Sequence, residues 1–157
     1  MHLVEKAAER GSQVHQACAA IAQGLMPMHY QEMTGYVDSF RGWFRRVVVE
    51  VWTVEHYLET HSMPPFCGTP DLIVKLKGES KLAVVDLKTP SAASRSWSLQ
   101  LAGYRRLAEL NGYSIGRAFS LRLDYNGGRP KVDEFRDYPI HLERFIQAAQ
   151  VWHFFHS

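Results

Sequence analysis

Two acidic residues and a lysine occupy positions from which they could act together. Asp86 and Lys88 alternate with Leu87 in the stretch 84–89, and Asp71 follows Gly68-Thr69-Pro70. Side chains alternate between the two faces of a strand, so a strand here points Asp86 and Lys88 to one side and Leu87 into the core. Asp71 begins the preceding predicted strand, and pairing of the two strands can bring its carboxylate beside that of Asp86.

Such a cluster suits a divalent cation and a phosphate. Two neighbouring carboxylates repel each other and raise each other's pKa, and a cation relieves that repulsion. Hard oxygen ligands favour Mg²⁺ or Mn²⁺. Lys88 could reach the same space, where it would orient or activate a water molecule or stabilise charge that develops on a phosphate. The alternative is an ordinary ion pair between Asp86 and Lys88 at a strand end.

The elements that must position these residues are predicted from apolar periodicity and turn residues. Helices are expected over residues 3–25, with Gly24 and Pro27 at the end, over 37–46, over 94–111 with Gly112 as the cap, and from Pro139 to 155. Strands are expected over 47–56, 67–76, 81–88, 118–125 and 131–138. Gly78-Glu79-Ser80 indicates a hairpin between the second and third strands, and Asn126-Gly127-Gly128 a turn between the last two. This order predicts an α/β fold in which helices cover a sheet of about five strands.

Length and composition fit one domain over residues 1–157. Apolar residues make up 46% of the chain and aromatic residues 12%, which is enough to form a core. The net charge of +2 is compatible with a nucleic-acid partner without requiring one. Cys18 and Cys67 form no C-x-x-C motif, so we expect no zinc knuckle and no disulfide framework. No signal peptide or membrane span is recognisable, and we expect a cytoplasmic protein without a membrane partner.

Short motifs in a defined order resemble the signature of the RecB-like nucleases of the PD-(D/E)XK superfamily, a group that includes many phage exonucleases. The motifs are Arg10-Gly11-Ser12-Gln13-Val14-His15, Gly68-x-x-Asp71, Asp86-Leu87-Lys88-Thr89 and Gln100-x-x-x-Tyr104. The resemblance spans residues 15–104 and implies a restriction-endonuclease-like core with a mixed β-sheet flanked by helices. It also implies a DNA nuclease that depends on Mg²⁺ or Mn²⁺. The four cysteines that hold an iron–sulfur cluster in some members are missing here, so we expect no such cluster.

The resemblance also implies which residues bind the metal. These are His15, Asp71, Asp86 and the backbone carbonyl of Leu87. An imidazole ligand must be neutral, so metal affinity should fall as the pH drops through about 6.5. Imidazole also shifts the preference towards Mn²⁺ over Mg²⁺. The alternative for His15 is a core histidine whose ring is satisfied by a backbone carbonyl.

Other side chains could complete the site. Glu55, in the first predicted strand, is the candidate for a further acidic residue, with Glu50 and Glu59 as alternatives. Gln100 and Tyr104 share one helical face, from which they could bind a DNA phosphate or hold the catalytic lysine in place. Packing of this helix on the sheet is the alternative explanation for both.

Several arginines could bind the phosphate backbone of DNA. Arg45 and Arg46 follow the aromatic residues 43–44, and arginine beside aromatic side chains suits single strands, whose bases stack. Arg95 and Arg105 flank the predicted motif helix. Each of these arginines, taken singly, is also explained by a solvated surface.

The function predicted on these grounds is hydrolysis of DNA by a metal-activated water, from a free end. The alternatives are a structure-selective endonuclease and a catalytically inactive DNA-binding module of the same fold. The intact acidic pair and lysine weigh against the inactive module. A small-molecule-binding α/β domain lacks support because the chain has no glycine-rich phosphate loop. The expected partners are single-stranded DNA or duplex ends, and recombination, repair or replication proteins of a bacterium or phage.

Overall fold

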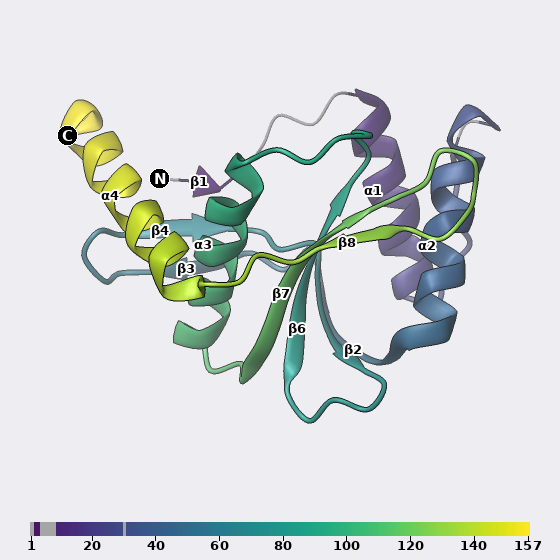
Figure 1. The fold of residues 1–157 in the computed structure, drawn as a ribbon, viewed down its shortest axis with the longest axis horizontal. Helices are drawn as coiled ribbons and strands as arrows, with labels where there is room; N and C mark the ends of the chain where they lie inside the picture. The colour runs from purple at the N-terminus through teal and green to yellow at the C-terminus, as the bar shows by residue number, and fades with distance from the viewer. Residues whose placement is uncertain (1, 4–8, 30) are drawn as a thin grey trace.

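A five-stranded mixed sheet lies at the centre of the fold (Figure 1). This computed structural model describes residues 2–3, 9–29 and 31–157. The strands lie in the order β2-β5-β6-β7-β8, in which only β6 and β7 are parallel. Their bounds are β2 Val48–Val54, β5 Leu72–Leu76, β6 Leu82–Lys88, β7 Ile115–Arg122 and β8 Lys131–Asp133. The predicted α/β fold with a mixed sheet of about five strands is confirmed.

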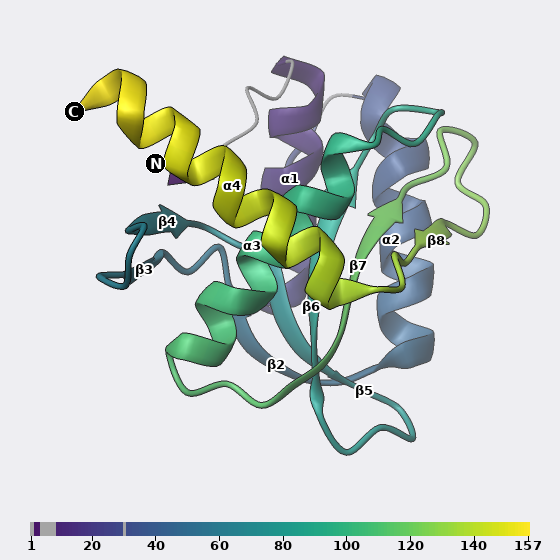
Figure 2. The same ribbon diagram turned by 60° about the vertical axis from the view of Figure 1, so that its left-hand side comes forward.

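Two pairs of helices cover the two faces of this sheet, as Figures 1 and 2 show. One face carries α1 (Glu9–Ala22) and α2 (Thr34–Val47), which a 3₁₀ turn, η1 (Gln31–Met33), precedes. The other face carries α3 (Ser96–Leu110), against which α4 (Tyr138–His156) packs from outside. The helix α3 connects the parallel strands β6 and β7 and so forms the crossover that such a pair requires. None of the helices in the described ranges is long and apolar enough to cross a membrane.

The central strand β6 is buried along its whole length. Its odd-numbered residues Val85 and Leu87 pack with α1 and α2, whereas Val84 packs with α3. Asp86 and Lys88 therefore face α3, and they are the charged members of the buried set among the described residues. Burying a charge is costly unless it is paired, so these two side chains need a specific environment.

A second, three-stranded sheet of order β1-β4-β3 lies beside α3 and was not predicted. It consists of β1 (His2–Leu3), β3 (Leu58–Thr60) and β4 (Phe66–Gly68). The predicted strand 67–76 is wrong in this respect, because residues 69–71 separate β4 from β5 and Pro70 has no N–H for a ladder. The predicted helix 3–25 begins in error at Leu3, which belongs to β1, and its part over residues 4–8 lies outside the described residues.

Other predicted boundaries differ from the observed ones by a few residues. The helix expected over 37–46 begins at Thr34, and the strand expected over 118–125 runs from Ile115 to Arg122. The strand expected over 131–138 is short because Tyr138 already opens α4, with Pro139 in its first turn. The hairpin of β5 and β6 is confirmed. So is the cap at Gly112, whose φ of 94° is accessible mainly to glycine.

Candidate functional site

The candidate site lies where β5 begins and β6 ends. Leu72 pairs with Val85, which places Asp71, directly before β5, next to the end of β6. The Leu87 N–H donates a hydrogen bond of 2.7 Å to Asp71 Oδ2. The expected juxtaposition of Asp71 with Asp86 and Leu87 is therefore present, although Asp71 precedes the strand instead of starting it.

His15 reaches the same place from α1. Its Nε2 lies 2.8 Å from the Leu87 carbonyl oxygen and 3.4 Å from Asp71 Oδ2, and its Nδ1 faces the Gly11 carbonyl. Because both ring nitrogens face hydrogen-bond acceptors, the protonated imidazole satisfies both contacts. Burial alone would lower the pKa of His15, but the hydrogen bond and charge of Asp71, together with the Gly11 carbonyl, raise it to about 9. The predicted titration near 6.5 is wrong for this arrangement, which holds His15 protonated at neutral pH.

The two carboxyl groups differ in their readiness to ionise. Burial and the charge of Asp71 raise the pKa of Asp86 to about 7, against the opposing charge of Lys88. Burial would also raise the pKa of Asp71, but the hydrogen bond and charge of His15 and the Leu87 N–H lower it. Asp71 is thus the ionised member of the pair at neutral pH, while Asp86 titrates there.

Lys88 is buried and is held by three groups. Its Nζ lies 3.0 Å from Asp86 Oδ2, donates a hydrogen bond of 2.8 Å to Gln100 Oε1, and lies 5.4 Å from the centre of the Trp97 ring. Gln100 Nε2 in turn donates to the Tyr104 hydroxyl at 3.4 Å. This arrangement corresponds to the expectation that Gln100 and Tyr104 hold the lysine, whereas their binding of a phosphate stays a prediction. Sequence reasoning missed Trp97, although its spacing of one helical turn from Gln100 would have placed it on the same face of α3.

The groups around Leu87 include candidate ligands for a metal ion. No three side chains among His, Cys, Asp and Glu in the described ranges stand in an arrangement that would hold one. However, the Leu87 carbonyl and Asp71 Oδ2 both lie within 3.4 Å of His15 Nε2. Asp86 Oδ2 is buried, and its partner is the Lys88 ammonium 3.0 Å away. Two neighbouring carboxylates in a largely buried place, with a carbonyl and an imidazole beside them, fit Mg²⁺ or Mn²⁺ once His15 loses a proton.

Glu55 lies near this cluster but not in the strand that was predicted to carry it. It follows the end of β2 with a φ of 46°, and its N–H donates to the Asp71 carbonyl at 2.9 Å. Partial burial and the charge of Asp71 raise the pKa of Glu55, against the charge of His15. Of the alternatives, Glu50 pairs with Lys75 further along β2, and Glu59 lies on β3, where it accepts a hydrogen bond from the Tyr57 hydroxyl.

Two of the predicted DNA-binding arginines lie at the end of the sheet opposite the candidate site. Arg45 and Arg46 are in the last turn of α2, which leads directly into Val48 at the start of β2. The site is at the other end of β2, where Val54 pairs with Leu72. The seven residues of this strand span about 23 Å. Arg45 and Arg46 therefore lie far from the cluster around Lys88, and their binding of DNA stays a prediction.

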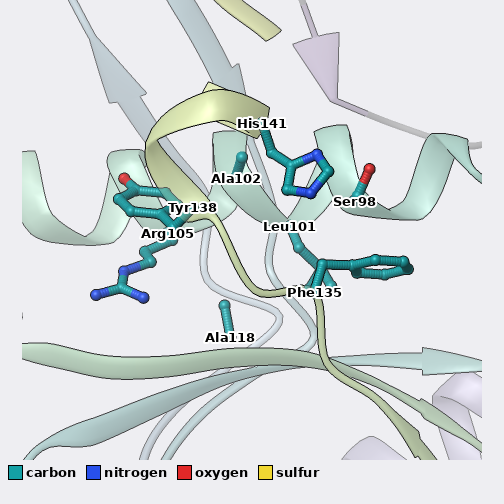
Figure 3. A pocket seen from close by; sticks show the side chains of 8 residues that line it. All are labelled: Ser98, Leu101, Ala102, Arg105, Ala118, Phe135, Tyr138 and His141. Carbon is teal, nitrogen blue, oxygen red and sulfur yellow. The ribbon is translucent and has the colours of Figure 1, made fainter. Parts of the chain in front are cut away.

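The other two arginines have different surroundings. Arg95 is exposed and immediately precedes α3, in the segment that follows the site lysine. Arg105 forms an ion pair with Glu109 at 3.1 Å and lies 4.3 Å from the centre of the Tyr138 ring. Arg105 and Tyr138 border the small cavity of about 20 Å³ in Figure 3, which has room for about one water molecule. Arg105 is thus engaged in joining α3 to α4.

Comparisons with known proteins give a distant likeness among solved structures and none in sequence. No family model matches the chain, and no match was found among curated proteins. Among solved structures, the chain is similar to the crystal structure of an alkaline exonuclease, LHK-Exo, from Laribacter hongkongensis. The TM-score is 0.45 and the sequence identity is 13%, over 95% of this chain and 81% of that chain.

Proposed function

We propose that this chain is a metal-dependent nuclease that hydrolyses phosphodiester bonds of DNA. The observation that carries the proposal is the meeting of His15, Asp71 and the Leu87 carbonyl beside the buried pair of Asp86 and Lys88. The motifs that resemble those of RecB-like nucleases contain each of these residues, and this resemblance is the reason for proposing DNA as the substrate. The same resemblance leads us to propose DNA ends as the preferred substrate.

The metal would be held by His15 Nε2, the carboxylates of Asp71 and Asp86, and the Leu87 carbonyl. A bound Mg²⁺ or Mn²⁺ would supply a Lewis acid that polarises the phosphate and lowers the pKa of a water molecule. For this role His15 must give up its Nε2 proton, which now faces the Leu87 carbonyl and Asp71. Asp86 must be ionised, which its pKa of about 7 permits in slightly alkaline solution.

Lys88 has a separate task in the proposed reaction. During hydrolysis, a water oxygen bonds to phosphorus and the bridging oxygen leaves with the electron pair, so negative charge accumulates on the phosphoryl group. The Lys88 ammonium neutralises part of that charge, and a donor that is fixed in advance costs no reorganisation. Gln100 fixes Lys88 through the 2.8 Å hydrogen bond, and Tyr104 lies next to Gln100. We assign Gln100 and Tyr104 as positioning residues.

A catalytically inactive DNA-binding module is the weaker candidate. Removing a carboxylate and an ammonium from water costs several kcal/mol per ion unless the pair is fully satisfied. Lys88 compensates one buried carboxylate, but Asp71 places a second carboxylate beside Asp86 and, with burial, raises the pKa of Asp86 to about 7, an arrangement that a purely structural ion pair does not need. Strongly shifted pKa values at a paired site of this kind are typical of functional centres.

Cleavage of end-labelled DNA tests the proposal. Linear single strands, linear duplexes and circles of the same sequence would be incubated with Mg²⁺, with Mn²⁺ and with excess EDTA. We expect cleavage with either ion, none with EDTA, and faster cleavage of linear DNA. Asp86→Asn should abolish cleavage, whereas the control Glu79→Gln, which changes a half-buried carboxylate that pairs with Arg117 in the β5–β6 turn, should cleave normally. Undiminished cleavage in EDTA would refute metal dependence, and equal rates on circles and linear DNA would favour an endonuclease.

A further inference from the structure

A cleft of about 360 Å³ opens beside the candidate site, at the ends of β6 and β7. Thr89 and Ser91 border it on one side and the loop after β7 on the other. It adjoins the site directly, because Lys88 pairs with Arg122 and the Leu123 N–H donates to the Lys88 carbonyl at 2.9 Å. The cleft lies on the β7 side of Lys88, whereas Asp71 lies on the β5 side.

Three cationic side chains line the cleft, and only two of them are available to a ligand. Arg122 is bound by Asp133, at 3.0 Å and 3.3 Å, and donates to the Ser91 carbonyl, so its charge is already neutralised. Arg129 and Lys131 are exposed, and no side chain in the described part of the molecule forms an ion pair with either. The acidic neighbour Asp124 is occupied by two backbone N–H groups of its own loop. Two unpaired cations in one cleft suit phosphate groups.

An aromatic side chain stands at the rim of the same cleft. Tyr125 is 58% exposed, and its ring meets the buried Tyr36 ring edge-on, with 5.6 Å between the ring centres. An exposed ring next to phosphate-binding cations is the arrangement on which unpaired bases stack. Bases within a duplex are already stacked on their neighbours, so such a ring favours a single strand.

The loop that carries Tyr125 is held in place before any ligand binds. Asp124 accepts hydrogen bonds from Asn126 N–H and Gly128 N–H, and its own N–H donates to Ser39 on α2. A Cβ on Gly35 would lie 1.6 Å from the Tyr125 carbonyl oxygen, so only glycine permits this contact between α2 and the loop. A preformed loop avoids the entropy cost of ordering it on binding.

We propose that this cleft binds an unpaired strand of nucleic acid, with a base stacked on Tyr125 and phosphates bound by Arg129 and Lys131. The inference rests on the proposed nuclease function and specifies the form of its substrate. That substrate is an unpaired strand that runs across the end of the sheet from β5 to β7. Two strand spacings separate Asp71 from the cleft, about 10 Å, a distance that a few nucleotides of an unpaired strand can span. The bound segment therefore flanks the bond to be cut.

Binding without cleavage tests the proposal. Fluorescence anisotropy in EDTA would measure the affinity of a short labelled single strand and of a duplex with the same sequence. The variants are Tyr125→Ala, Tyr125→Phe and the double variant Arg129→Ala/Lys131→Ala. Lys77→Ala/Lys81→Ala is the matched control, since it removes the same charge from the β5–β6 turn at the opposite end of the sheet. Circular dichroism would verify that each variant is folded.

We expect Tyr125→Ala to weaken single-strand binding about five- to one-hundredfold, with Tyr125→Phe close to wild type and duplex binding unchanged. Loss of two phosphate contacts should reduce the slope of log K against log salt by about 1.4 relative to the control. Any of three results would overturn the proposal: no single-strand binding by the wild type, equal affinities of the cleft and control double variants, or unchanged affinity in Tyr125→Ala. If these losses occur but Mn²⁺ gives no cleavage, the cleft stands and the nuclease function falls. If the cleft variants instead cleave DNA at the normal rate and with the normal KM, the nuclease function stands and the proposed role of the cleft falls.

Discussion

The proton on His15 should link the stability of the metal-free protein to pH. The native pKa of His15 is about 9, against an unfolded value of 6.5, so the native state binds more protons between these values. The stabilisation is complete below pH 6.5 and is lost as the pH rises through 9. For these two pKa values, raising the pH from 7 to 9 removes about 2 kcal/mol from the free energy of unfolding.

Urea unfolding in EDTA at pH 7, 8 and 9 measures this change, with His15→Gln as the comparison because glutamine keeps hydrogen-bonding capacity and does not titrate. Cys18 also contributes above pH 8, since burial raises the pKa of its thiol, but it does so equally in both proteins. Asp86 titrates around 7 and adds little in this window. We therefore expect the difference in unfolding free energy between wild type and His15→Gln to shrink by about 2 kcal/mol from pH 7 to 9.

If the difference in unfolding free energy between wild type and His15→Gln stays constant from pH 7 to 9, His15 does not carry the proton that we assign to it between Asp71 and the two carbonyl groups. A second arm adds Mn²⁺ at pH 9, where His15 gives up its proton most easily. Wild type should gain stability in proportion to RT ln(1 + [Mn²⁺]/Kd), and His15→Gln should gain less. Equal gains would remove His15 from the metal site while leaving its protonation intact.

Three further outcomes are expected. Cleavage at limiting Mn²⁺ should rise with pH through about 7, because Asp86 must lose its proton to bind a cation, and a flat pH–rate profile from 6 to 8 would contradict this role. Lys88→Met should lower kcat by about a hundred- to a thousandfold with Mn²⁺ affinity retained, and Gln100→Leu should lower kcat less. Calorimetric titration measures Mn²⁺ affinity separately from kcat, and a loss of that affinity in Lys88→Met would contradict the assigned role. Gly35→Ala should destabilise the fold by about 1–3 kcal/mol in urea unfolding because its Cβ would meet the Tyr125 carbonyl. An unchanged midpoint would show that the loop moves away from α2 without a cost in stability.

The part of the site that depends on local rules could be predicted from the sequence. Side-chain alternation placed Asp86 and Lys88 on one face of β6, and the turn at residues 78–80 predicted the hairpin that brings Asp71 near them. Both are properties of neighbouring residues. His15 is different, since it meets Leu87 across 72 positions of sequence. Only the resemblance to a nuclease family pointed to this contact, because periodicity alone fits a core histidine equally well.

Features that depend on long-range packing escaped prediction. Arg45 and Arg46 precede β2 directly, and their proximity in sequence to the site strands gave no sign that the strand carries the chain about 23 Å away from them. The cleft beside β7 was missed for the same reason. Arg129 and Lys131 belong to no motif, and Tyr125 was assigned to a strand. The turn residues 126–128 could have indicated an exposed aromatic at a loop, but the contact with Gly35 that positions it is tertiary.

The pKa of His15 shows how such contacts change the chemistry that residue types suggest. An unperturbed histidine has a pKa near 6.5 and is a neutral ligand at pH 7. Here Asp71 and the Gly11 carbonyl bind the protonated ring more strongly than burial disfavours it, and the pKa is about 9. A cation can reach Nε2 only by displacing a proton, so its apparent affinity through His15 should fall about tenfold for each pH unit below 9. Asp86 imposes a second requirement of the same sign around pH 7. Below pH 7 both groups must lose protons, so metal affinity should fall about a hundredfold for each pH unit there, a slope that neither residue would confer alone.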